Sequence, residues 1–243
     1  MTRPTAPSLD NDTMGDLPVT MMPPARPGLF ERSQHRLDGR AALVTGAGDA
    51  GDELPSIGFA IAVLFGVAGA DVAVLDIDAR AAQYTVDHIN GLGGRASAVV
   101  ADVRRRDQVD RAVGNAVDQF GRLDAIVNNA AVLGSASTLD AADEEFQRTL
   151  DVNVMGTIRV SRAVLAHLGP GSSITHISSL GSLRSFGKLD YEASKGAINT
   201  MVNTMAVEYG PRGIRVNAVS PGQVWTPAPG ILLFFLGAGR VLV

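Results

Sequence analysis

Short apolar segments alternate with longer segments that carry apolar residues at helical spacing along most of this chain. The short segments are rich in valine, isoleucine and alanine and are bounded by polar residues or glycine, as is typical of buried strands. We therefore expect strands at Arg40–Thr45, Asp71–Leu75, Arg95–Val100, Ala125–Asn128, Ser173–Ile177 and Arg215–Val219. We expect helices at Ile57–Val67, Ala79–Leu92, Asp107–Phe120, Glu144–Leu168 and Tyr191–Tyr209, with Asp107 as the N-cap of its helix.

This alternation predicts one α/β domain, built as a doubly wound parallel sheet flanked by helices on both faces. Ligands of such sheets bind at the carboxyl ends of the strands, near the point where the strand order reverses. The segment Ile57–Leu75 is almost entirely apolar and resembles a membrane span, but Asp71 and three glycines interrupt it. A buried helix followed by a buried strand explains it better.

The first 36 residues hold six of the 12 prolines and show no periodic pattern. We expect a disordered tail over residues 1–36, because such a segment cannot bury enough apolar surface to order itself. This segment also has no apolar core of a secretory signal, so a cytoplasmic protein is the default expectation.

Composition excludes several classes of site. The chain has no cysteine, which rules out disulfides, thiolate catalysis and cysteine-based metal centres. Its four histidines are scattered without ligand spacing, so no metal is expected. The formal net charge of −4 gives no reason to invoke nucleic acid or an anionic membrane as a partner.

A glycine-rich turn follows the first predicted strand. Gly46 and Gly48 come first, and the next helix opens at Ser56, Ile57 and Gly58. Glycines permit a tight turn and let backbone N–H groups approach a pyrophosphate at a helix N-terminus. The segment 49–55 between them holds three acidic residues, which are unfavourable beside a phosphate unless the loop swings outward. A glycine-rich turn without any ligand is the alternative.

Three further strand ends carry residues that suit a dinucleotide. Asp76 follows the second strand, 18 residues after Gly58. A carboxylate there can accept hydrogen bonds from both ribose hydroxyls of NAD and would repel the 2′-phosphate of NADP. An ordinary strand-end aspartate is the alternative. An adenine could pack beside Asp102 and Val103, and the small Ala130 after Asn129 leaves room for a cofactor.

Candidate catalytic residues cluster before and within the last predicted helix. Tyr191 and Lys195 are four residues apart and so share a helix face. An ammonium beside a phenol favours phenolate, which would lower the pKa of the tyrosine and make it a proton carrier. Ser178 lies thirteen residues before Tyr191 and could hold a substrate oxygen against the phenol. By itself, a tyrosine and lysine at this spacing usually decorate an exposed helix.

Taken together, these motifs resemble those of the short-chain dehydrogenase/reductase family, from about Leu37 to Thr226. Their order along the chain matches the family's order. The matching positions are Thr45, Gly46, Gly58, Asp76, Asp102, Asn128, Asn129, Ala130, Asn153, Ser178, Tyr191, Lys195, Pro221, Gly222, Val224 and Thr226. The resemblance implies a Rossmann-like fold, NAD as cofactor and an alcohol or carbonyl compound as substrate. It also implies a homodimer or homotetramer.

The resemblance also implies a role for each catalytic position. Tyr191 would be the general acid/base, and Lys195 would lower its pKa and hold the nicotinamide ribose. Ser178 would polarise the substrate oxygen; the neighbouring Ser179 is the alternative, but the spacing to Tyr191 and a Ser-x-x-Gly pattern favour Ser178. Asn153 would anchor a water next to Lys195, or it only kinks its helix.

The same resemblance places a second group of residues over the nicotinamide: Pro221, Gly222, Val224 and Thr226. The chain departs from the family at Ser56, which stands where a glycine is usual, and at the segment 49–55. Family members also continue further after the threonine with a substrate lid and a last strand. Residues 227–243 form a short apolar tail instead, which is either a shortened version or unrelated sequence from a truncated or frameshifted reading frame.

Two functions remain in view. The first is an NAD-dependent alcohol dehydrogenase or ketone reductase, whose substrate the sequence does not identify. The second is a catalytically impaired relative that serves as a nucleotide-binding or interaction protein, which the altered turn and short C-terminus favour. Arg104, Arg105 and Arg106 resemble a phosphate patch but are explained most simply as a solvated loop before a helix.

Overall fold

The computed structural model describes residues 37–51, 55–134, 139–222 and 224. Within these ranges the strands are β1 (Ala41–Thr45), β2 (Asp71–Asp76), β3 (Arg95–Val100), β4 (Ala125–Asn128), β5 (Ser173–Ile177) and β6 (Arg215–Val219). The α-helices are α1 (Ile57–Val67), α2 (Ala79–Gly91), α3 (Arg106–Phe120), α4 (Asp143–Leu150), α5 (Thr157–Val164) and α6 (Leu189–Tyr209). Three short elements complete the set: the π-helix η3 (Asp151–Gly156) and the 3₁₀ turns η4 (Leu180–Ser182) and η5 (Gly210–Arg212).

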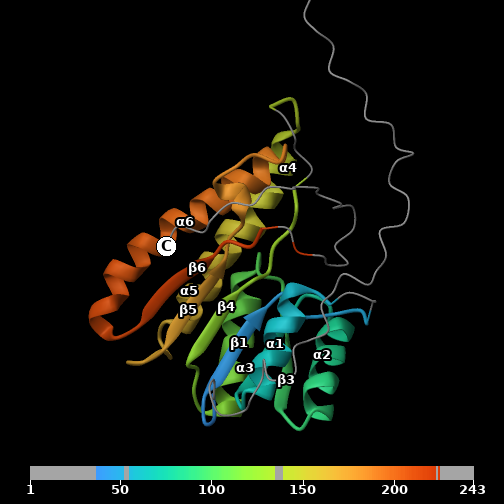
Figure 1. Cartoon of the computed structure of the whole chain (residues 1–243), viewed down its shortest axis with the longest axis vertical. Helices are drawn as coiled ribbons and strands as arrows, with labels where there is room; N and C mark the ends of the chain where they lie inside the picture. The colour runs from blue at the N-terminus through green and yellow to red at the C-terminus, as the bar shows by residue number, and fades with distance from the viewer. Residues whose placement is uncertain (1–36, 52–54, 135–138, 223, 225–243) are drawn as a thin grey trace, which may run out of the picture. The chain divides into compact units, whose positions relative to one another are not determined.

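The strands form one parallel sheet in the order β3-β2-β1-β4-β5-β6 (Figure 1). The chain moves outward from β1 to β3 and then returns to the other side of β1 through β4. The strand order therefore reverses between β1 and β4, where a doubly wound sheet binds its ligand. The predicted fold class is confirmed.

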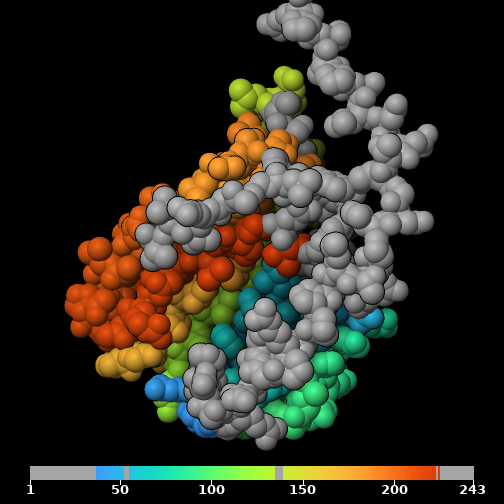
Figure 2. Space-filling model, in the orientation of Figure 1, coloured from blue at the N-terminus to red at the C-terminus, as the bar shows by residue number. Residues whose placement is uncertain are grey.

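Alternating residues of the strands supply two separate cores. On β1, Leu43 packs with residues of α3 and α5, whereas Val44 packs with residues of α1 and α2. Both side chains are fully buried. This is the period-2 alternation of a strand that is covered on both faces, so helices on the two faces hold the sheet between two apolar layers. In the space-filling view the side chains of α6 (orange to red) and α2 (green) lie on opposite sides of the visible face (Figure 2).

The apolar segment after the glycine-rich turn divides as predicted into helix α1 and strand β2. Ser56 caps α1, because its hydroxyl accepts a hydrogen bond from the N–H of Phe59 at 3.1 Å. Among the described residues, none of the helices has both the length and the apolar content needed to cross a membrane.

Several predicted boundaries differ from the structure: β1 begins at Ala41, β2 ends at Asp76 and α2 ends at Gly91, each one residue from its predicted bound, and three helical segments differ as follows. The single long helix expected at Glu144–Leu168 is divided into α4, η3 and α5, since the six residues of η3 wind as a π-helix. Helix α3 begins one residue before Asp107, which therefore lies in the first turn and pairs with Arg111 instead of capping the backbone. Helix α6 begins at Leu189, two residues earlier than expected.

The predicted tails at 1–36 and 227–243 lie outside the described residues, as does the expected replacement of the last strand.

Candidate functional site: a cleft at the carboxyl ends of the strands

A cleft of about 770 Å³ opens at the carboxyl ends of β1, β2, β4 and β5. Its volume is typical of a site for a cofactor and a small substrate. It is lined by sixteen of the predicted site residues: Gly46, Gly48, Ser56, Ile57, Gly58, Asp76, Asp102, Val103, Asn129, Ala130, Ser178, Tyr191, Lys195, Pro221, Gly222 and Val224. The predicted Asn153 is not among the lining residues, and Thr226 lies outside the described residues.

The glycines of the turn permit close contacts between backbone segments. Gly46 has a φ of 59°, and a Cβ added to it would lie 2.7 Å from the Cα of Ala130. A Cβ on Gly58 would collide with the carbonyl oxygen of Gly46 and come within 2.6 Å of the Asn129 side chain. A larger residue at Gly58 would push α1 away from the turn after β1, and one at Gly46 would push that turn away from the loop after β4, so both positions require glycine.

Asp49 joins the two ends of the segment 49–55, which follows Gly48. This carboxylate is buried and accepts hydrogen bonds from the N–H groups of Gly51 and Ser56, both at 2.8 Å. The two ends of the insertion are thereby held together beside the start of α1. Asp49 thus turns inward, and backbone N–H groups compensate its charge, whereas the sequence analysis considered acidic residues here unfavourable unless the loop swings outward. Asp52 and Glu53 lie outside the described residues.

Asp76 faces the cleft at the end of β2. Its carboxylate accepts hydrogen bonds from the N–H groups of Gly48 at 2.9 Å and Asp78 at 3.0 Å. A Cβ on Gly48 would lie 2.8 Å from the Asp76 carboxyl carbon, so this glycine allows the carboxylate to approach the turn. The side chain is fixed at the point where the sequence predicted a ribose contact.

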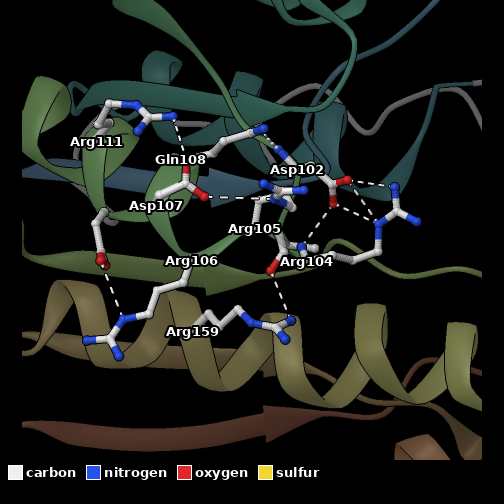
Figure 3. A network of polar contacts seen from close by, with 10 residues as sticks. Asp102, Arg104, Arg105, Arg106, Asp107, Gln108, Arg111 and Arg159 are labelled. Carbon is white, nitrogen blue, oxygen red and sulfur yellow. Dashed lines mark hydrogen bonds and ion pairs between the residues drawn. The ribbon is translucent and has the colours of Figure 1, made fainter.

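Asp102, at the end of β3, is paired with Arg104 across a tight turn (Figure 3). The Arg104 guanidinium donates to both carboxylate oxygens, with N–O distances of 2.6 to 3.0 Å. These hydrogen bonds lower the pKa of Asp102, although partial burial opposes the shift. Both side chains line the cleft. The adenine side of the predicted site therefore holds an ion pair and not a lone carboxylate.

Arg105 and Arg106 face solvent, as the sequence suggested. Arg106 approaches Asp110 at 3.5 Å along α3, and Arg105 approaches Asp107 at 3.8 Å (Figure 3). These are exposed pairs, each of which contributes little to stability. Only Arg104 of the three arginines lines the cleft.

Tyr191 and Lys195 lie together on the face of α6 that borders the cleft. The Lys195 ammonium is 5.4 Å from the centroid of the Tyr191 ring and donates to the carbonyl oxygen of Ile177 at 2.7 Å. Burial lowers the pKa of Lys195 to about 8. Burial also raises the pKa of Tyr191, and a hydrogen bond with Ser179 only partly opposes this shift. The sequence predicted the opposite direction for Tyr191; desolvation of the phenolate outweighs the other effects here.

The two neighbouring serines have different surroundings. Ser178 is 2 % exposed, and its hydroxyl donates to the carbonyl oxygen of Lys195 at 3.1 Å. The hydroxyl of Ser179 accepts the N–H of Gly181 at 3.0 Å. It also acts on the phenol of Tyr191, whose pKa it lowers against the larger opposing effect of burial. Both serines line the cleft, but the Ser178 hydroxyl is engaged with the backbone of Lys195.

Asn153 lies within the π-helix, fully buried behind the wall of the cleft. Its side chain donates to the carbonyl oxygen of Val132 and accepts the N–H of the same residue, at 2.9 and 2.8 Å. It also donates to the hydroxyl of Ser194, the residue before Lys195, at 3.0 Å. Asn153 therefore ties the loop after β4 to α6. Short π segments are frequent at functional sites, where they redirect a side chain.

A buried polar group lies behind Lys195. His176 is fully buried on β5, and its Nδ1 is 3.2 Å from the amide nitrogen of Asn128 on β4. That amide also donates to the hydroxyl of Ser161 at 3.1 Å. Burial, together with the positive charge of Lys195, lowers the pKa of His176 to about 4, so this imidazole is neutral near pH 7.

Four charged residues that line the cleft were not predicted as site residues: Asp49, Arg104, Arg148 and Lys188. The sequence offers no signal for Arg148, since an arginine on an amphipathic helix is ordinarily a solvated residue. Lys188 lies directly before α6, and the sequence predicted no role for it.

The chain matches known proteins over most of its length. Residues 53–232 match a family model described as enoyl-(acyl carrier protein) reductase. A 7α-hydroxysteroid dehydrogenase of Escherichia coli is 35% identical over 203 residues, which are 82% of this chain and 77% of that protein. The chain belongs to the short-chain dehydrogenase/reductase family.

Solved structures of other family members share the fold. A short-chain dehydrogenase from Burkholderia cenocepacia in complex with NADP aligns with a TM-score of 0.73 and 39% identity, covering 80% of both chains. An NAD⁺-bound xylitol dehydrogenase aligns with a TM-score of 0.70 and 31% identity, covering 76% of this chain and 70% of that one. Membership makes this short-chain dehydrogenase/reductase an oxidoreductase by family.

Proposed function

We propose that this protein transfers hydride between NAD(H) and a secondary alcohol or ketone, with Tyr191 as the general acid/base. The observation that carries the proposal is that Tyr191, Ser179 and the buried Lys195 line one cleft, with the Lys195 ammonium 5.4 Å from the centroid of the Tyr191 ring. Two hydroxyl groups that meet at one point of a cleft can both bind a single substrate oxygen.

The glycine-rich turn fits the pyrophosphate of a dinucleotide. The N–H groups of Ile57 and Gly58 lie in the first turn of α1, where no intrahelical acceptor exists, and both residues line the cleft. The absence of a side chain at Gly58 lets the cofactor approach the backbone closely. The hydrogen bond from the N–H of Ser56 to Asp49 holds the start of α1 beside the ends of β1 and β4.

NAD is the proposed nucleotide because of Asp76. Its carboxylate would accept hydrogen bonds from the ribose hydroxyls and would repel a 2′-phosphate. The next residue, Ile77, is exposed and supplies no positive charge that would bind such a phosphate. Solved relatives bind either nucleotide, so the choice rests on these two positions.

In this mechanism the bound nicotinamide accepts or supplies the hydride, and the protein orients the substrate and moves the proton. The raised pKa of Tyr191 keeps its phenol protonated at neutral pH, ready to donate to a carbonyl oxygen during reduction. Ser179 would donate a second hydrogen bond to that oxygen. We propose it in place of Ser178 because the Ser178 hydroxyl is already engaged with the Lys195 carbonyl, whereas the Ser179 hydroxyl lowers the pKa of Tyr191. The Lys195 ammonium, fixed on the Ile177 carbonyl, would stabilise the phenolate that remains.

The variant Tyr191→Phe tests the proposal. It removes the proton donor and keeps the ring, so turnover of a ketone panel with NADH should fall by about 10³-fold or more. Binding of NADH, measured by titration calorimetry, should stay within about twofold of the parent, because the nucleotide contacts lie elsewhere. Retained turnover in the variant would refute the role of Tyr191. A folded parent protein that binds NADH without turning over any substrate would favour the non-catalytic alternative.

A further inference from the structure

Two basic side chains, Arg148 of α4 and Lys188 at the start of α6, line the same cleft as Tyr191. Arg148 is exposed and Lys188 is half-buried. Across the part of the chain that the structure describes, neither forms an ion pair within 4.0 Å. Arginine and lysine that face a cleft without an internal partner are suited to bind an anion.

A hydrogen bond between α4 and α6 brings the two cations to the same part of the cleft. The hydroxyl of Thr149, the residue after Arg148, donates to the carboxylate of Asp190 at 2.7 Å. Asp190 lies two residues after Lys188 and directly before Tyr191. The two basic residues therefore lie on the two sides of a fixed contact next to the proposed proton donor.

The carboxylates of α6 near these cations are already engaged. Asp190 is fully buried and accepts the hydroxyl of Thr149 and the N–H of Tyr191. Glu192 accepts the N–H groups of Phe186 and Lys188 and the hydroxyl of Ser185. Glu192 thereby holds the segment before α6 in place, with Phe186 and Lys188 against the cleft.

On α4, Glu144 and Glu145 precede Arg148 by about one helical turn. They line a smaller cavity of about 250 Å³ that Arg148 also borders. Neither makes a salt bridge with Arg148 among the pairs formed by the described side chains. Arg148 lines both cavities, whereas Glu144 and Glu145 do not line the main cleft.

The other end of the cleft carries the opposite charge. Asp49, Asp76 and Asp102 line the part formed by the ends of β1, β2 and β3, where Arg104 is committed to Asp102. Arg148 and Lys188 lie instead beside Tyr191, away from the proposed ribose contact. The free positive charge is thus at the end that receives the substrate.

We propose that Arg148 and Lys188 bind an anionic group of the substrate, so that the preferred substrate is a carbonyl compound carrying a carboxylate or a phosphate. The inference rests on the proposed function, because it takes Tyr191 as the donor to the carbonyl oxygen. Leu133 and Phe186 also line the cleft. These apolar side chains suit a short carbon chain between the carbonyl and the anionic group.

The test compares matched ketones in the NADH-dependent reaction. Acetoacetate is paired with its neutral methyl ester, and dihydroxyacetone phosphate with dihydroxyacetone. The parent should prefer the anionic member of at least one pair by about tenfold or more in kcat/KM. Preference within the first pair identifies a carboxylate site, and preference within the second identifies a phosphate site. Equal rates within both pairs, or faster neutral substrates, would overturn the proposal.

Variants then connect the preference to the two residues. Arg148→Gln and Lys188→Gln should each raise KM for the preferred anion by about tenfold and leave the neutral partner within about twofold. Arg148→Lys and Lys188→Arg keep the charge and should retain most of the preference. Arg184→Gln is the matched control, since Arg184 is exposed on the same segment as Lys188 but does not line the cleft. Equal losses with charged and neutral substrates would show a merely structural role and refute the inference.

A binding measurement separates this inference from the proposed function. Binding of acetoacetate and of dihydroxyacetone phosphate is measured by calorimetry with NADH present, on the parent and on the double variant Arg148→Gln/Lys188→Gln. Anion binding that the double variant loses would support the cation site even if the parent reduces no ketone. Unchanged binding in the double variant, or no binding of either anion to the parent, would refute it, whatever the turnover.

Discussion

The two ends of the cleft differ in how their polar groups are satisfied. At the nucleotide end, the carboxylates of Asp49 and Asp76 accept hydrogen bonds from backbone N–H groups. The absence of side chains at Gly46 and Gly58 lets neighbouring backbone segments lie in contact. At the catalytic end, buried side chains contact one another and the backbone from three elements, β5, η3 and α6. The first end depends on chain conformation and the second on side-chain chemistry.

This difference bears on the segment 49–55, where the sequence departs from the family pattern. A loop can accommodate extra residues when hydrogen bonds hold its two ends together. Here the carboxylate of Asp49 accepts the N–H of Ser56 and joins the two ends. The catalytic end offers no such freedom, because Asn153, Ser194 and Lys195 are almost fully buried and interlocked. Changes at the catalytic end should therefore have the larger effects.

The largest expected effect concerns His176 and acid. Its pKa is about 4 in the folded chain and 6.5 in an ordinary setting, so between these values the unfolded state binds more protons. Stability should then be lost as the pH falls from about 6.5 to 4, by about 3 kcal/mol. Denaturant unfolding across this range, compared with His176→Asn, measures the difference, which the variant should lack. His167→Asn, at an exposed position, should keep the parent's slope; equal slopes in all three proteins would contradict the account.

The sequence predicted the sheet, its helices and most cleft residues because these follow from periodicity and from glycine positions. It did not predict the π-helix, since the hydrogen bonds of Asn153 to Val132 join positions 21 residues apart. It favoured Ser178 on the spacing to Tyr191 and on the Ser-x-x-Gly pattern, whereas the serine that acts on Tyr191 depends on which way each hydroxyl points as the chain leaves β5. The inward turn of Asp49 likewise depends on its hydrogen bonds with the N–H groups of Gly51 and Ser56, which no local pattern encodes.

The second prediction separates the two serines. Ser179→Ala removes a donor to the reacting oxygen and should lower kcat by about 10²-fold. Ser178→Ala removes a buried hydrogen bond to the Lys195 carbonyl, so it should cost about 1 kcal/mol of stability and change kcat far less. Steady-state kinetics and thermal unfolding of both variants check this pattern. The reverse pattern would return the role to Ser178.

The third prediction concerns the nucleotide end of the cleft. Gly58→Ala places a Cβ against the Gly46 carbonyl oxygen and should cost about 1–3 kcal/mol of stability and weaken NADH binding. Gly114→Ala, inside α3 with open space around it, should instead stabilise the fold by about 0.5–1 kcal/mol. Thermal unfolding compares them. If Gly58→Ala changed neither the stability nor the NADH binding, α1 would not be held against β1 as described.

The central claim is that the cleft, with its closed insertion and with Asp76 at the ribose position, takes NAD(H). Titration calorimetry of the folded protein with NADH, and separately with NADPH, tests it most directly. The account predicts saturable binding of NADH that is tighter than any binding of NADPH, because the Asp76 carboxylate opposes the 2′-phosphate. Binding of neither nucleotide by a folded chain, or tighter binding of NADPH, would contradict it.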